Sequence, residues 1–262
     1  MMISRIIRTG IAFGTFFVGA LVLVCGPFLF LQIIPFKKDK KEVYARSMIR
    51  LSFRFFVALM RGLGLIHKPI IKGIETNIIG KSCIYVANHP SLIDVVLLGS
   101  VLPDATCIVK HAHWENFFLG GVMKAAGYIP NINGPQLLEE CQKAFDRGIS
   151  LMIFPEGTRS TKAGMGSFKR GTARLLFGSE ATVIPIIITC YPRTLMKHQK
   201  WYEIPGEKVK YSIHFMPQME IPNSIETEPQ LPKKVRAFTK YMEEYFREQI
   251  NIQKSSTSIN QR

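Results

Sequence analysis

A histidine and an aspartate five residues apart could carry acid–base chemistry in the segment ANHPSLIDVVLL. The apolar run before them ends at Asn88, so His89 falls in a turn and Asp94 in the first turns of the helix expected to follow. A carboxylate so placed can fix the tautomer of the imidazole and stabilise the imidazolium, which leaves the other ring nitrogen free to take a proton from a hydroxyl. The spacing alone is weak evidence, since a hydrogen-bonded histidine at a strand end is common.

The attacking hydroxyl need not belong to the protein. Ser91 is two residues from His89, but side chains so spaced rarely reach the geometry of a catalytic triad, and nothing like a nucleophile elbow surrounds it. Its expected role is to cap the helix that carries Asp94. The nucleophile is therefore expected to be a hydroxyl of the substrate.

A second group of polar residues follows the apolar run that ends in IFP. The segment Phe154–Ser160 combines backbone amides near a glycine, two hydroxyls and a guanidinium, which together could bind a phosphate. The residues that could bind it are Gly157, Thr158, Arg159 and Ser160. The alternative is a tight turn in which Glu156 and Arg159 pair with each other.

Taken together, the two motifs resemble those of the glycerolipid acyltransferase family typified by 1-acylglycerol-3-phosphate acyltransferase. The family's first motif is His, four residues, then Asp, and here it is matched by His89 and Asp94, with Asn88 before and Ser91 after the histidine. The family's Phe-Pro-Glu-Gly-Thr-Arg-Ser motif is unbroken. Its FKRG segment and its proline-containing strand resemble Phe168–Gly171 and Val183–Ile186.

This resemblance implies a fold and a reaction. The fold would be a single mixed-sheet α/β acyltransferase domain flanked by helices. His89 would deprotonate the acceptor hydroxyl of a lysophosphatidic acid or related lysolipid, Asp94 would support His89, and residues 156–160 would bind the acceptor's phosphate. The acyl donor would be acyl-CoA or acyl carrier protein, with no cofactor, no metal and no covalent acyl-enzyme. A non-catalytic module that binds anionic membranes on the same fold remains the alternative.

One position departs from the family pattern. An arginine usually ends the family's second motif and helps to hold the acceptor phosphate, whereas the corresponding phrase Tyr128-Ile129-Pro130 is followed by Asn131. Asparagine has no fixed positive charge. Either the acceptor headgroup differs, or another cation replaces the arginine, for which the candidates are Lys124, Lys169, Arg170 and Arg174.

Short apolar runs alternate with helical patterns in the middle of the chain. Five runs are typical of strands, several of them buried on both faces; they cover residues 82–88, 105–111, 149–155, 181–189 and 209–216. Helices are expected over 92–101, 135–148 and 168–178. This alternation predicts an α/β domain over residues 67–222, followed by a C-terminal helix and polar tail over 223–262.

The N-terminal part, residues 1–66, is predicted to anchor the chain in a membrane. Residues 11–36 contain no charge and are long enough to enter or cross a bilayer, although Gly26-Pro27 could turn the run into a hairpin. Lysines after the run favour a cytoplasmic location for the rest of the chain, at the inner membrane in a bacterial cell. Arg46, Arg50 and Arg54 then recur on one face of an expected amphipathic helix that would lie among lipid headgroups or, alternatively, pack on the core with a solvated basic face.

The composition agrees with a membrane partner. Lys and Arg outnumber Asp and Glu by 34 to 19, giving a formal charge of +15, while 47% of residues are hydrophobic. Nucleic acid would also attract this charge, but no recognised binding motif is present. No metal site is expected, because the five cysteines are scattered, and because His111 and His113, expected on one side of a strand, share no spacing with carboxylates.

Overall fold

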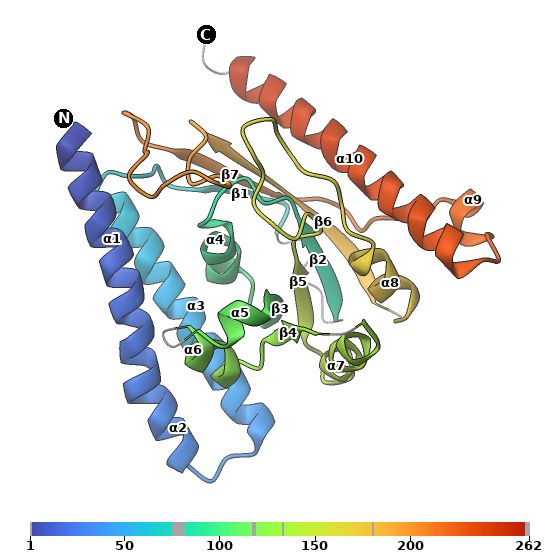
Figure 1. The fold of residues 1–262 in the computed structure, drawn as a ribbon, viewed down its shortest axis with the longest axis horizontal. Coiled ribbons are helices and arrows are strands. Elements are labelled where there is room, and N and C mark those ends of the chain that lie inside the picture. The colour runs from blue at the N-terminus through green and yellow to red at the C-terminus, as the bar shows by residue number, and fades with distance from the viewer. Residues whose placement is uncertain (1, 75–81, 117–118, 133, 180, 260–262) are drawn as a thin grey trace. The chain divides into compact units, whose positions relative to one another are not determined.

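The computed structural model describes the chain except for residues 1, 75–81, 117–118, 133, 180 and 260–262 (Figure 1). Its residues cluster into two compact units, each discontinuous in sequence. The first unit comprises Met1–Leu65 and Val95–Leu151, and the second comprises Ile66–Asp94 and Met152–Arg262. The domain boundaries predicted after residues 66 and 222 remain predictions.

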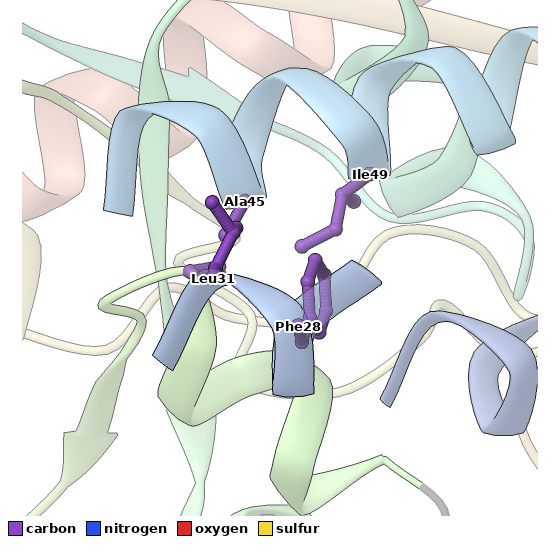
Figure 2. Close-up of a cluster of buried hydrophobic side chains, with 5 residues drawn as sticks. Phe28, Leu31, Ala45 and Ile49 are labelled. Atoms are coloured by element: carbon purple, nitrogen blue, oxygen red, sulfur yellow. The ribbon is translucent and has the colours of Figure 1, made fainter. Parts of the chain in front are cut away.

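The first unit begins with helices. They are α1 (Met2–Leu23), a π-helical turn η1 (Val24–Phe28), α2 (Leu29–Ile33) and α3 (Lys38–Gly62). The helical path continues through Pro27, so no hairpin forms there; residues Met2–Ile33 make one helix long and apolar enough to cross a membrane. Figure 2 shows how Phe28 and Leu31 pack against Ala45 and Ile49 of α3, in a buried cluster that also includes Ala126.

The arginine face of α3 is not a uniformly solvated stripe. Arg46 is only 4% exposed and donates to Asp104 and to the carbonyl oxygen of Ala126. Arg54 donates to the carbonyl oxygen of Ser100 at 2.9 Å. A helical periodicity shows which residues share a face but not what that face contacts, and two of these arginines bind other parts of the first unit.

Short strands and helices complete the first unit. They are most of α4 (Asp94–Val101), then β3 (Ala105–Lys110), α5 (His111–Trp114), α6 (Gly120–Ala125), β4 (Ile129–Asn131), α7 (Gly134–Asp146) and the start of β5 (Ser150–Ile153). Strands β3 and β4 are parallel, with Lys110 opposite Asn131. The expectation that His111 and His113 lie on a strand is wrong, because β3 ends at Lys110 and both residues belong to α5.

The second unit contains β1 (Ile70–Lys72), β2 (Cys83–Ala87), α8 (Gly171–Phe177), β6 (Thr182–Tyr191), β7 (Lys210–Phe215), α9 (Asn223–Glu226) and α10 (Leu231–Ile259). Here β1 is parallel to β7, β7 is antiparallel to β6, and β6 is parallel to β2. Every residue of β2 is buried, as is most of β6, because the branched apolar side chains of both strands are covered on two faces.

The predicted fold class is confirmed: in the part of the chain that the structure describes, seven strands form a mixed sheet flanked by helices. All five apolar runs form strands, and the three predicted helices form within one to three residues of their expected starts. Two three-residue strands, β1 and β4, were missed because they are too short to show a period. Helix α10 packs on β6 and α8 (Figure 1) and continues to Ile259, so it takes up most of the segment 223–262 in which a helix and a polar tail were expected.

Candidate active site

The end of β2 presents His89 to a buried carboxylate. His89 follows the strand, and its Nδ1 lies 2.9 Å from Oδ2 of Asp94, the first residue of α4. The backbone N–H of Ser91 donates to the same oxygen at 2.7 Å. With Nδ1 bonded to the carboxylate, Nε2 of His89 is the nitrogen that can accept a proton, and the described residues provide no hydrogen bond to it.

Burial dominates the electrostatics of Asp94. The residue is 0% exposed, and desolvation raises the pKa of its carboxyl from 3.8, although the hydrogen bond from His89 and the charge on that ring oppose this effect. Oδ1 of Asp94 has no hydrogen-bond partner within the part of the chain that the structure describes. The carboxylate is therefore committed to His89 and Ser91, and a positive charge on His89 offsets part of its burial cost.

Glu156 connects the two motifs from inside the protein. It is 2% exposed, and Oε1 accepts the backbone N–H of His89 at 2.8 Å while Oε2 accepts that of Gly166 at 2.7 Å. The hydroxyl of Ser160 lies 3.0 and 3.2 Å from the two oxygens. In return, the carbonyl oxygen of His89 accepts the N–H of Ser160 at 2.8 Å. A carboxylate so fully bonded holds the histidine turn against residues 156–166, and it is not placed to contact an anion.

The other predicted substrate-binding residues lie nearer the surface. Gly157 is exposed with a φ of +64°, a conformation that favours glycine, and its N–H donates a hydrogen bond to the carbonyl oxygen of Phe154. Thr158 and Arg159 are half-buried. Arg159 donates to the carbonyl oxygen of Leu195 at 2.9 Å and forms no ion pair with the described carboxylates, so the alternative pairing with Glu156 is absent there.

Arg159 keeps its charge near the histidine pair. Burial lowers the pKa of its guanidinium, and the negative charge of Asp94 acts in the opposite direction. A guanidinium stays protonated over any ordinary pH range. Arg159 therefore supplies a permanent cation with uncommitted donors, as a phosphate site requires.

A second cation lies beside the same turn. The side chain of Lys169, one of the candidates to replace the missing arginine, passes within 3.7 Å of the position that a Cβ on Gly157 would occupy. Its backbone N–H donates to the carbonyl oxygen of Pro155 at 2.7 Å. Helix α10 supports this segment, because Glu243 accepts the N–H of Phe168 at 2.9 Å. Lys124 and Asn131 belong to the first unit.

Several supporting residues were missed at the sequence level. The side-chain amide of Asn88 exchanges two hydrogen bonds with the backbone of Ile188, at 2.7 and 2.8 Å, and so ties the end of β2 to β6. The ring of Phe154 stacks on that of His89, with centroids 4.3 Å apart. The Ser91 hydroxyl bonds the Tyr211 hydroxyl instead of capping α4. Asn88, Ser91 and Phe154 lie within the two motifs, but the motifs did not show these contacts, and Tyr211 carried no signal in the sequence.

Among the described residues, no three His, Cys, Asp or Glu side chains lie close enough together to hold a metal ion. The site instead combines an oriented imidazole with a neighbouring cation. Such a pair can remove a proton from a hydroxyl and hold an anionic group close to it.

Comparison with known proteins agrees with the motifs. Residues 68–189 match the family model described as Acyltransferase. The chain is 29% identical to the chloroplastic 1-acyl-sn-glycerol-3-phosphate acyltransferase BAT2 of Brassica napus, over 47% of this chain and 37% of that protein. It is 25% identical to 1-acyl-sn-glycerol-3-phosphate acyltransferase alpha of Mus musculus, over 54% and 55% respectively. The matches thus span about a third to about a half of the relatives' length.

A solved structure shares the fold. The 1-acyl-sn-glycerophosphate acyltransferase PlsC of Thermotoga maritima superposes with a TM-score of 0.66 and 20% sequence identity, covering 90% of this chain and 96% of that one. The family model lies over the strands and turns that bring His89, Asp94 and Glu156 together. Over residues 68–189 the chain is therefore similar to the Acyltransferase family model and to proteins named as 1-acyl-sn-glycerol-3-phosphate acyltransferases.

Proposed function

We propose that the protein transfers a fatty acyl group from a thioester donor to the hydroxyl of a lysophospholipid-like acceptor. The observation that carries this proposal is the contact of 2.9 Å between His89 and the fully buried Asp94, which leaves Nε2 of the ring available as a base. The printed names of the relatives, which are acyltransferases acting on 1-acyl-sn-glycerol-3-phosphate, support the substrate class.

The reaction requires one proton transfer in each direction. Nε2 of His89 takes the proton of the acceptor hydroxyl as its oxygen attacks the thioester carbonyl, and a C–O bond forms. When the C–S bond breaks, the thiolate of CoA or of an acyl carrier protein leaves and receives the proton from the imidazolium. Asp94 acts through His89, by fixing its tautomer and stabilising the charged ring.

Arg159 is the group proposed to bind the acceptor's phosphate. Its donors, together with Thr158, would hold the headgroup beside the histidine, so that the hydroxyl reaches Nε2 in a productive orientation. Glu156 and Ser160 would position this segment from behind, since both are buried and bonded to each other. No cofactor enters this scheme.

The apolar helix Met2–Ile33 supports a membrane location, where a lipid acceptor is found. We place the site on the cytoplasmic side, where acyl-CoA and acyl carrier protein are available. This orientation is based on the lysines at positions 37, 38, 40 and 41, after the apolar run.

The test is transfer of labelled acyl groups to a panel of lysolipids, from both acyl-CoA and acyl carrier protein, by purified wild type and His89→Ala. We expect transfer by the wild type and a loss of about 10²–10⁴-fold or more in the variant, with an unchanged circular dichroism spectrum. Full turnover by a folded His89→Ala would refute the mechanism. No transfer by the wild type to any lysolipid would favour the non-catalytic membrane-binding module.

A further inference from the structure

The loop between β6 and β7, residues 192–209, is longer than its connection requires. The two strands are antiparallel and pair as far as Tyr191 opposite Lys210. Loops that join such strands ordinarily have about two to five residues, and much longer ones are usually functional or disordered. This β6–β7 loop is ordered by its own hydrogen bonds, including those from Met196 N to Gln199 and from Lys200 N to Glu203.

The backbone of the β6–β7 loop is strained where it meets the site. Leu195 and His198 have φ values of 53° and 65°, which residues other than glycine rarely adopt and which occur often at functional sites. The carbonyl oxygen of Leu195 accepts hydrogen bonds from Arg159 at 2.9 Å and from the N–H of Leu92 at 3.1 Å. The loop is therefore bonded to both sequence motifs.

A further bond links the β6–β7 loop to the turn after Glu156. The N–H of Lys197 donates to the carbonyl oxygen of Ser160 at 3.1 Å, and Ser160 N donates in turn to His89. Beyond this attachment the chain projects aromatic side chains outward. Trp201 is 45% exposed and Tyr202 is 42% exposed, and their rings pack edge to face with centroids 5.6 Å apart.

Basic residues surround these aromatic rings. The ammonium of Lys200 lies 5.5 Å from the centre of the Tyr202 ring. Residues 191–210 contain two acidic side chains, Glu203 and Glu207. The basic side chains of the same segment are more numerous: Arg193, Lys197, Lys200, Lys208 and Lys210. Exposed Trp and Tyr beside lysines are typical of membrane–water interfaces, where the ring sits among the headgroups and the cation meets anionic lipid.

We propose that the β6–β7 loop is a lipid-binding element that inserts Trp201 and Tyr202 into the headgroup region of an anionic membrane. This inference rests on the proposed function, because it explains how a site in the second unit meets an acceptor that stays in the bilayer. Leu92, which is 41% exposed and bonded to the loop, extends the apolar surface toward His89. Binding of an acidic carrier protein would explain the lysines, but it would not explain the exposed rings of Trp201 and Tyr202.

The test uses the intrinsic fluorescence of Trp201 in the full chain. Trp114 is the other of the two tryptophans, so Trp114→Phe makes Trp201 the sole reporter. This variant is reconstituted in nanodiscs of phosphatidylcholine, with and without phosphatidylglycerol. We expect emission at shorter wavelength, protection from aqueous iodide and quenching by brominated phosphatidylcholine, each stronger when phosphatidylglycerol is present. Neutralising Lys197 or Lys200 with glutamine should lower the ratio of inserted to water-exposed Trp201 by about fivefold for each charge.

Two controls separate this proposal from the proposed function. Trp201→Phe reports the background from Trp114, and His89→Ala on the Trp114→Phe background should leave the Trp201 signal unchanged even when acyl transfer is lost. Inserted Trp201 in a protein without transferase activity would refute the proposed function alone. Trp201 that is fully open to iodide and unaffected by brominated lipid overturns the lipid-binding proposal, as does a response to an acidic carrier protein but not to lipid.

Discussion

Two groups of charged side chains, one around Arg46 in the first unit and one around His89 in the second, differ in the hydrogen-bond and ion-pair partners of their atoms. In the first unit, Arg46 binds Asp104 and lies 3.6 Å from Glu42, which also accepts a hydrogen bond of 2.8 Å from Arg147. Each charge there faces an opposite charge, and the atom left without a hydrogen bond among the described residues is Nη2 of Arg46, which carries no basic lone pair. In the second unit, Asp94 and Glu156 mainly accept N–H and O–H groups, and the described residues leave Nε2 of His89 without a hydrogen bond.

This difference shows that buried charge alone does not identify a catalytic site. The Arg46 cluster joins α3 to later segments of the first unit. Gly127 beside it has a φ of +66°, which favours glycine, and a Cβ there would also lie 2.6 Å from a carboxylate oxygen of Glu42. Its expected contribution is to stability. The His89 cluster is organised so that one basic atom stays available, and its expected contribution is to rate.

The largest expected effect is on turnover, from Asp94→Asn. The amide cannot stabilise the imidazolium and favours the wrong tautomer of His89, so kcat should fall by about 10³–10⁴-fold. Stopped assays of labelled acyl transfer measure this loss, with a thermal melt as the control for folding. A loss of less than tenfold in a folded variant would place Asp94 in a merely structural role, like the charges around Arg46.

Arg46→Ala should have the opposite profile. Removing it leaves the half-exposed Asp104 without this partner and the carbonyl oxygen of Ala126 without its donor, while Glu42 keeps Arg147, so the change should cost about 1–3 kcal/mol of unfolding free energy. Turnover per folded molecule should not change. Denaturant unfolding measures the cost, and Arg50→Ala on the same helix is the matched control, with an expected change below about 0.5 kcal/mol. Equal stability of the two variants would contradict the comparison.

A smaller effect is expected from Lys169→Gln, because Lys169 lies beside Gly157 and could supply the charge that Asn131 lacks. Loss of one charge-assisted hydrogen bond should raise the KM for a phosphate-bearing acceptor by about tenfold, with kcat nearly unchanged. Lys162→Gln, an exposed lysine earlier in the same loop, is the control. If KM rises equally in both, the effect is general electrostatic attraction and not a phosphate contact.

The last expected effect is a pH-dependent difference in stability. Because burial raises the pKa of Asp94, the folded protein holds a proton that the unfolded chain has released. The resulting stabilisation is complete below pH 3.8 and is lost as the pH rises through the raised pKa. Asp94→Asn lacks this titration, so its unfolding free energy should increase relative to wild type from pH 4 toward neutrality, by at most about 1.4 kcal/mol per pH unit. Denaturant unfolding at several pH values would show a flat difference if this account is wrong.

Sequence patterns predicted contacts that are short in the chain and missed those that depend on distant partners. The five-residue spacing of His89 and Asp94 predicted their contact because a turn and one helical start separate them. Glu156 was predicted to bind substrate, since nothing local shows that its carboxylate turns inward to His89 and Gly166. The periodicity of α3 likewise identified the face of Arg46 but not the carboxylate that it meets.

The measurement that tests the central claim most directly is a double-mutant cycle on acyl transfer with His89→Ala, Asp94→Asn and the combined variant. If Asp94 acts only through His89, the combined variant should be no slower than His89→Ala alone, although each single change costs at least about a hundredfold. Losses that multiply in the combined variant would contradict the account, because Asp94 would then serve the reaction independently of His89.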